Sequence, residues 1–370
     1  MNHKLITLVM AIAVIASLVL IGCAPEAAPP EEGAPPAAPE EPTAPAAEEL
    51  PTWDLRITTI DSVADMEDRC GEWRDDIYQM TGGRVSMHLY STYELIPDEQ
   101  VMPAMKAGTI DGAKYMCWCN PELTQTGWVE GALPYSLDNP IESEVLYHFR
   151  GLREIFEEDY ANYGVKYVCP WHCDASSTVI STRPIEKLED FQGLKISTFE
   201  PLGGYCWGKA GAQLVSVPAD EMYLAGKTGT LDAVGWGGAH QYYMMGLEEA
   251  FPYYLANSAC GTLATNVIWN QEVWDSFGPE IQTMIECASI KASIKDSARK
   301  YDGESWGREP YVVTRLSDED EAVLKQYAYE YWDELAQRNA ISAKVVQIYK
   351  DYVKELEATK WHREGVELPF

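Results

Sequence analysis

Residues 182–238 read TRPIEKLEDFQGLKISTFEPLGGYCWGKAGAQLVSVPADEMYLAGKTGTLDAVGWGG and predict three strands that alternate with two helices. Glycines mark most of the joints between the apolar runs, and a proline opens the second helix, where no N–H donor is needed. The expected elements are strands at 194–197, 213–217 and 231–235 and helices at about 204–210 and 218–228. In such α/β units ligands bind at the carboxyl ends of the strands. We therefore expect the binding site beside Ser197, Thr198, Phe199 and Trp236.

The composition limits the class of protein. The chain has 370 residues and 46% hydrophobic residues, enough for two domains with apolar cores. Its formal net charge is −30, so nucleic acid and anionic membrane surfaces would be repelled and are not expected as partners.

The first 52 residues lie outside the predicted fold. Lys4 and the apolar run 5–20 are typical of a signal peptide, and Leu20-Ile21-Gly22-Cys23 is typical of a bacterial lipobox. We expect 1–23 to be a lipoprotein signal with Cys23 as the lipidated residue; an ordinary signal peptide or an N-terminal span is the alternative. Residues 24–52 are rich in Ala, Pro and Glu and predict an extended tether. The folded part is therefore expected outside the cytoplasm, held to the membrane by lipid only.

A second α/β unit precedes the opening stretch and repeats part of it. KAGTIDG at 106–112 matches KTGTLDA at 227–233, and both follow strand–helix patterns. This repeat predicts two similar α/β lobes. Asp111 and Asp232 are expected to bind turn backbone rather than to act as catalysts. The other expected elements are strands at 53–60, 84–90, 109–115, 167–169, 178–182 and 262–270 and helices at 62–80, 98–107, 142–163, 279–300 and 318–358. In the helix at 142–163, the side chains expected to face inward are Leu146, Phe149, Leu152 and Phe156.

The candidate site is rich in aromatic side chains and neutral polar groups, as small-molecule sites are. No nucleotide-binding, nucleophile-elbow or zinc-protease motif occurs, and no metal or cofactor is expected. An enzyme that uses His172 or His240 is one alternative. A redox or metal-binding protein that uses Cys117, Cys119, Cys169 and Cys173 is another, although their spacing is not that of a zinc site. The predicted ligand-binding residues are Tyr90, Tyr93, Trp118, Trp171, Ser177, Ser197, Phe199, Trp236, His240 and Tyr243.

From about Trp53 to Tyr352 the chain resembles the DctP-type solute-binding subunit of TRAP transporters. The resemblance is carried by TGGRVSMHLYSTYELIPDEQVMPAMKAGTIDGA, STRPIEKLEDFQGLKI and GAQLVSVPADEMYLAGKTGTLDAVGW. It implies a two-lobed, type II-like periplasmic binding fold with crossing strands and a long helix that spans both lobes. It also implies capture of a small organic solute by closure, delivery to a membrane permease, and no enzymatic activity. The expected lobes are 53–174 with about 263–300, and 175–262 with about 301–358.

The sequence departs from the family where the ligand is held. Ser197 stands where most members have Arg, and Ser176-Ser177 lie near a position that is commonly basic or amide in the family. Gly235 stands where a metal-using branch for keto or hydroxy acids has Glu, and no carboxylate occurs at 257–261, where its second acidic contact would fall. A neutral hydroxyl cannot replace a guanidinium. We therefore expect an aromatic or otherwise apolar organic solute, with or without a carboxylate that another basic residue would have to hold.

Overall fold

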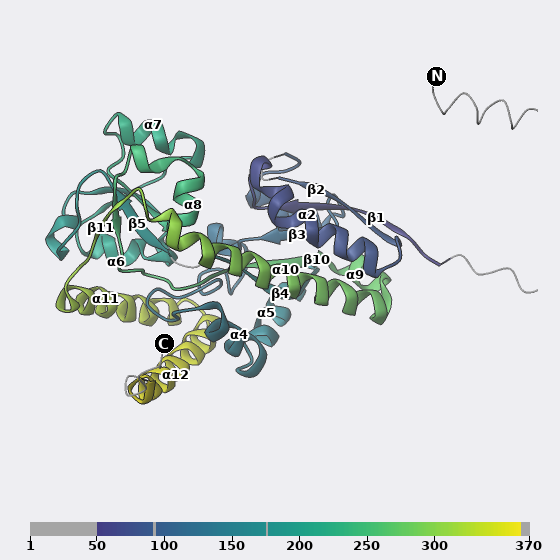
Figure 1. The fold of residues 1–370 in the computed structure, drawn as a ribbon. Helices are drawn as coiled ribbons and strands as arrows, with labels where there is room; N and C mark the ends of the chain where they lie inside the picture. The colour runs from purple at the N-terminus through teal and green to yellow at the C-terminus, as the bar shows by residue number, and fades with distance from the viewer. Residues whose placement is uncertain (1–49, 92–93, 175–176, 364–370) are drawn as a thin grey trace, which may run out of the picture. The chain divides into compact units, whose positions relative to one another are not determined.

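The computed structural model describes residues 50–91, 94–174 and 177–363, which contain two β-sheets (Figure 1). The first sheet has the order β2-β1-β3-β10-β4. β1 pairs in parallel with β2 and β3, whereas β10 is antiparallel to both of its neighbours. We call the part built on this sheet the first lobe. Its strands are β1 (Trp53–Thr59), β2 (Val85–Tyr90), β3 (Gly112–Tyr115), β4 (Val165–Asp174) and β10 (Leu263–Asn270).

The second sheet has the order β11-β9-β5-β8-β6-β7 and forms the second lobe. β6 pairs in parallel with β7 and β8, and β5 is antiparallel to β8. The order β7-β6-β8-β5 therefore repeats β2-β1-β3-β10 of the first lobe, and the prediction of two similar α/β lobes is confirmed. Its strands are β5 (Thr178–Ser181), β6 (Lys195–Ser197), β7 (Gln213–Val215), β8 (Ala233–Gly237), β9 (Tyr253–Leu255) and β11 (Val312–Thr314).

The repeated turn has the same function in both lobes. Asp111 Oδ2 accepts a hydrogen bond from the backbone N–H of Arg56 at 2.7 Å, and Asp232 Oδ2 accepts one from that of Lys195 at 2.9 Å. In each case the carboxylate binds the backbone of the neighbouring parallel strand, in the middle of β1 and at the first residue of β6. The structural interpretation of the two aspartates holds, although each binds the next strand rather than its own turn.

The chain crosses between the sheets where β4 leads to β5 and β9 leads to β10. Ser177 and Cys260 form an isolated antiparallel bridge at this crossing, with a 2.7 Å hydrogen bond from the N–H of Ser177 to the carbonyl of Cys260. The crossing strands implied by the resemblance are therefore present. The lobe boundaries at 174/175 and 262/263 stay a prediction.

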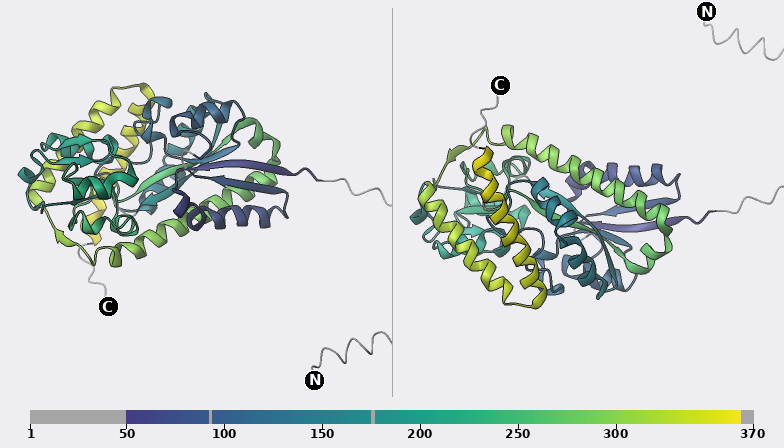
Figure 2. Two further views of the ribbon diagram at one scale, coloured as in Figure 1. Left: turned by 90° about the horizontal axis from the view of Figure 1, so that it is seen from above. Right: turned by 90° about the horizontal axis from the view of Figure 1, so that it is seen from below.

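The long helix α10 (Gly278–Gly307) contacts both lobes and runs further than the predicted 279–300 (Figure 2). On the first lobe, the indole N–H of Trp73 in α2 (Val63–Met80) donates to Ser289 Oγ at 2.9 Å. On the second lobe, the N–H of His240 in α8 (Ala239–Met244) donates to Glu304 Oε1 at 3.3 Å. The remaining α-helices are α3 (Val101–Lys106), α4 (Pro140–Phe149), α5 (Leu152–Ala161), α6 (Gly204–Lys209), α7 (Met222–Lys227), α9 (Gln271–Ser276), α11 (Asp318–Ala336) and α12 (Ala340–Arg363).

Two helices were predicted wrongly, and the one expected at 318–358 is divided into α11 and α12. The expected single helix at 142–163 is two helices, α4 and α5, which are separated at Gly151 with φ of 80°. That left-handed residue ends the first helix and turns its last residues away from the core. Phe149 is consequently 79% exposed rather than buried, whereas Leu146, Leu152 and Phe156 are buried as expected.

Within the described ranges, no helix has both the length and the apolar character that are needed to cross a bilayer.

Candidate functional site

The carboxyl ends of β6 and β8 bring two predicted residues together. Ser197 ends β6 and is 4% exposed, and Trp236 lies near the end of β8. The hydroxyl of Thr198 donates to the carbonyl of Gly235, which fixes the two strand ends to each other. Phe199 follows and is 38% exposed, so an aromatic residue lies at the edge of this site.

An aromatic contact joins this edge to the first lobe. The rings of Trp118 and Phe199 meet edge to face, with centroids 5.3 Å apart and planes at 83°. Trp118 lies in the short helix η2 (Cys117–Cys119), and its indole N–H donates to the carbonyl of Ala264 at 3.2 Å. We call the following set the interlobe aromatic cluster: Trp118, Phe199, Leu202, Trp236, Cys260 and Leu263.

Trp236 is held in this cluster by Tyr242. The Tyr242 hydroxyl accepts hydrogen bonds from the N–H groups of Trp236 and Gly237 at 2.9 and 2.7 Å and donates to the carbonyl of Thr178 at 2.9 Å. The Trp236 and Tyr242 rings also meet edge to face at 5.9 Å. The indole Nε1 of Trp236 is buried and has no hydrogen-bond partner within the described part of the chain. A fixed ring therefore offers one N–H donor in mainly apolar surroundings.

His240 and Tyr243 lie on α8 and pack against α10. Their rings contact Trp306 at centroid distances of 5.2 and 5.4 Å. A Cβ added at Gly303 would lie 2.1 Å from Cδ2 of His240, so this glycine permits the close approach of the imidazole. Burial, and next the positive charge of Lys300, lower the pKa of His240.

The other predicted residues are placed as follows. Trp171 has no exposed surface, and its indole N–H donates to Asp296 Oδ2 at 3.0 Å, so it lies in the first-lobe core. Ser177 is buried at the crossing between the lobes, and Tyr90 is half-buried at the end of β2. Tyr93 and Cys23 lie outside the described residues.

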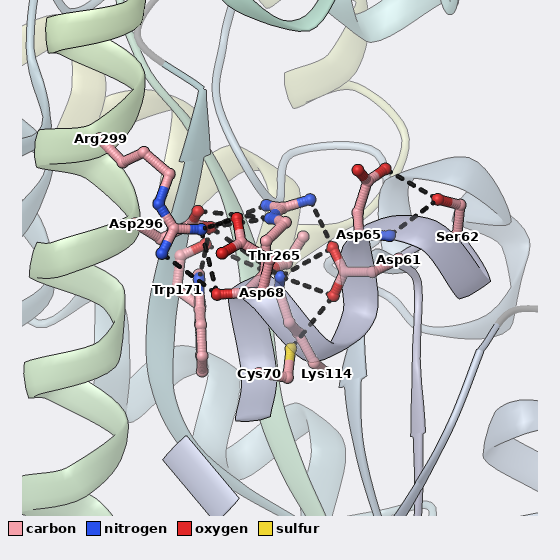
Figure 3. A network of polar contacts seen from close by, with 11 residues as sticks. Asp61, Ser62, Asp65, Asp68, Cys70, Lys114, Trp171, Thr265, Asp296 and Arg299 are labelled. Carbon is pink, nitrogen blue, oxygen red and sulfur yellow. Dashed lines mark hydrogen bonds and ion pairs between the residues drawn. The ribbon is translucent and has the colours of Figure 1, made fainter. Parts of the chain in front are cut away.

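Sequence reasoning missed a buried network of charges between α2, β3 and α10 (Figure 3). Lys114 has a fully buried side chain, and its Nζ lies 2.9 Å from Asp61 Oδ2 and 4.0 Å from Asp296 Oδ2. Arg69 contacts both carboxylates, at 2.8 Å in the case of Asp296, and the Lys114 ammonium lies 4.6 Å from the centre of the Trp171 ring. The one feature of the sequence that could have indicated this network is Lys114, a lysine between apolar residues of a predicted strand.

The network sets the charge states of its members. Burial alone would raise the pKa of Asp61, but the charges of Lys114 and Arg69 outweigh it and lower the pKa to about 2. Burial opposes the charge on Lys114, yet its neighbouring carboxylates raise its pKa above the ordinary value despite the nearby Arg69. These groups are therefore ionised at neutral pH, and the opposite charges among them stabilise one another.

The profile of DctP, described as bacterial extracellular solute-binding protein, family 7, matches residues 65–339. The chain belongs to this family. A curated relative is the monocarboxylate 2-oxoacid-binding periplasmic protein of Nostoc sp., 26% identical over 298 residues that cover 78% of this chain and 79% of the relative.

Solved structures of family members share the fold. A TRAP periplasmic solute-binding protein from Chromohalobacter salexigens with bound (S)-(+)-2-amino-1-propanol has a TM-score of 0.78 and 27% identity, covering 84% of this chain and 98% of its own. A TRAP solute-binding protein from Bordetella bronchiseptica with calcium and picolinate in its active site has a TM-score of 0.75 and 20% identity, covering 85% and 95%. The two-lobed DctP-type fold predicted from the sequence is confirmed.

In this solute-binding protein, Gly235 cannot simply be exchanged for the glutamate of the metal-using branch. A Cβ added at Gly235 would lie 2.5 Å from Cζ3 of Trp207 and 2.9 Å from Cδ1 of Ile196. The buried Trp207 ring therefore occupies the space that a side chain at 235 would need. Within the described part, no group of three or more His, Cys, Asp or Glu residues is arranged to hold a metal.

Two of the four cysteines considered for a redox or metal site are enclosed by the fold. Cys117 and Cys169 are free and buried, and burial raises the pKa of both thiols. His172 instead binds Glu144, with Nε2 2.8 Å from Oε1. The side chain of Cys173 lies outside the described part. Buried thiols with raised pKa values are poor nucleophiles and poor metal ligands.

Proposed function

We propose that this protein captures a small organic solute between its lobes, at the interlobe aromatic cluster, and delivers it to a TRAP membrane permease. The observation that carries the proposal is the buried indole N–H of Trp236, which lacks a partner among the described residues. A buried donor without a partner costs about 1–3 kcal/mol. A ligand oxygen or ring nitrogen that accepts this hydrogen bond would remove the cost.

The surroundings of Trp236 favour a ligand with an apolar or aromatic body. Trp118 and Phe199 offer ring edges and faces, and Leu202 and Leu263 are buried beside them. Such a site stabilises apolar surface and takes its orientation from a few polar groups. The ligands of two relatives, a monocarboxylate 2-oxoacid and picolinate, support an organic acid as the solute.

The protein is proposed to act at the outer face of the membrane, attached through lipid on Cys23. Replacing Cys23 with serine removes the thiol that would be lipidated. We expect the variant to leave the membrane fraction and to appear in the soluble extract. Membrane retention equal to that of the unaltered protein would exclude the lipid anchor.

The ligand site is tested with Trp236→Phe, which keeps an aromatic ring and removes the indole donor. Native mass spectrometry of the purified protein first identifies any retained small molecule, and calorimetry then measures its affinity. The variant is expected to bind about 5- to 100-fold more weakly, because one hydrogen bond to a buried donor is lost. Trp53→Phe is the matched control, since its indole donates to Ser276 at an exposed position.

Two results would contradict the proposal. Equal affinities of the unaltered protein and Trp236→Phe would exclude the indole as a ligand contact. The absence of any retained or bound solute in the unaltered protein would exclude the proposed function itself.

A further inference from the structure

We propose that Lys300 of α10 supplies the positive charge that holds the carboxylate of the bound solute. This inference rests on the proposed function, because it assigns a group of the same interlobe site. The strand position where most family members carry arginine is Ser197 here, so an anionic solute needs a cation from another element.

Lys300 lies in the middle of a buried row of charges. Asp296, Lys300 and Glu304 are four residues apart on α10, and residues at this spacing lie on one helix face. Their exposed fractions are 3, 6 and 8%. The row is therefore enclosed by protein although it consists of charged side chains, and such a row is costly unless each charge is compensated.

The two ends of this row contact different lobes. Asp296 accepts the indole N–H of Trp171, at the end of β4 in the first lobe. Glu304 accepts the N–H of His240, at the start of α8 in the second lobe. Lys300, between them, is thus buried where α10 passes from one lobe to the other, next to the segment that follows Trp236. Its charge is also one of the causes that lower the pKa of His240.

The carboxylates that flank Lys300 have further cationic partners. Asp296 lies 2.8 Å from Arg69, and Glu304 lies 3.1 Å from Arg308. An ammonium group has three donors, so Lys300 can keep its protein contacts and still donate to a ligand oxygen.

Other cations are less suited to the role. Lys114, the second buried lysine of the described part, is held by Asp61 at 2.9 Å in the first-lobe core. Arg183 donates to the carbonyls of Asp190 and Gln192 in exposed hydrogen bonds. Lys195 donates to the carbonyl of Gly229 at the amino end of its strand. Neither of these two side chains is therefore directed to the carboxyl ends of β6 and β8.

The first test compares acids with their neutral esters. Calorimetry measures the binding of pyruvate, picolinate and phenylpyruvate, and of the methyl ester of each, to the unaltered protein, Lys300→Met and Lys300→Arg. Lys300→Met is expected to bind the acids about 10- to 100-fold more weakly and the esters unchanged, because only the charged hydrogen bond is lost. Lys300→Arg keeps the charge and is expected to retain most of the preference for acids. Lys291→Met is the matched control, since this α10 lysine is exposed and paired with Asp76.

The second test needs no variant and therefore does not depend on how Lys300→Met folds. The imidazole of His240 is titrated by NMR in the unaltered protein, with saturating acid and with saturating ester. A carboxylate bound to Lys300 cancels part of the positive charge near His240, so the acid is expected to raise the pKa of His240 and the ester is not.

The outcomes separate the two proposals. Acid binding that is equal in Lys300→Met and the unaltered protein, or an unchanged pKa of His240 with bound acid, overturns the role of Lys300 and leaves the proposed function intact. If the unaltered protein binds no probe and retains no small molecule, the proposed function fails and the role of Lys300 fails with it.

Discussion

Replacing Lys114 with methionine is expected to lower the free energy of unfolding by about 3–5 kcal/mol, the cost of breaking a buried ion pair by removing one partner. Asp61 and Asp296 would stay buried without the ammonium that now lies 2.9 and 4.0 Å from them. Urea unfolding followed by tryptophan fluorescence measures the effect.

Lys291→Met is the control for this experiment. Lys291 also pairs with a carboxylate, Asp76 at 2.5 Å, but its side chain is 49% exposed. An exposed pair contributes about 0–1 kcal/mol, so this variant is expected to unfold almost as the unaltered protein does. Equal, small effects of the two substitutions would show that the buried network does not stabilise the fold.

The network also determines how the stability of the fold changes with pH. The pKa of Asp61 is about 2 in the folded state, against an ordinary value of 3.8. The unfolded state therefore binds more protons in this range, and the stability from Asp61 is complete above about pH 4 and is lost as the pH falls towards 2.

Gly235→Ala is expected to destabilise the second lobe by about 1–3 kcal/mol, the usual cost of overpacking a core. The new methyl group would meet Trp207, which lies 2.5 Å from its position. In a Trp207→Leu background the same change is expected to cost much less, because the smaller side chain vacates that space. Differential scanning calorimetry on the four proteins of this double-mutant cycle measures the coupling.

Gly208→Ala provides the matched glycine control. Gly208 lies in α6, and an added Cβ there meets no other atom within 4 Å. Alanine in a helix is favoured over glycine, so this variant is expected to be unchanged or slightly more stable. If Gly235→Ala lowers the stability equally in the unaltered protein and in the Trp207→Leu background, a steric clash with Trp207 is not the cause.

The sequence predicted the parts of the fold that depend on local pattern. The strands of both lobes were located from Gly193, Gly229 and the repeated Gly-Thr-apolar-Asp turn. Turns and strand alternation can be recognised within a few residues of sequence. The error at Phe149 arose because the helical periodicity continues through Gly151, whose left-handed conformation breaks the helix.

The features of the site that the sequence did not predict depend on contacts between segments that are distant in the chain. Trp171 and Trp236 are both aromatic residues in strands, yet one is enclosed by α2 and α10 and the other meets the opposite lobe. The exclusion of a side chain at Gly235 by Trp207, and the pairing of Lys114 with Asp296, join segments far apart in the chain. A single sequence contains no signal for such pairings beyond the unusual residue types themselves.

The attachment of α10 to both lobes has a mechanical consequence. Ser293 Oγ accepts a hydrogen bond from the backbone N–H of His172, and Glu304 accepts one from that of His240. The two lobes therefore hold the same helix at two points about 16 Å apart, at 1.5 Å of rise per residue. Any separation of the lobes must bend α10 or break one of these two hydrogen bonds.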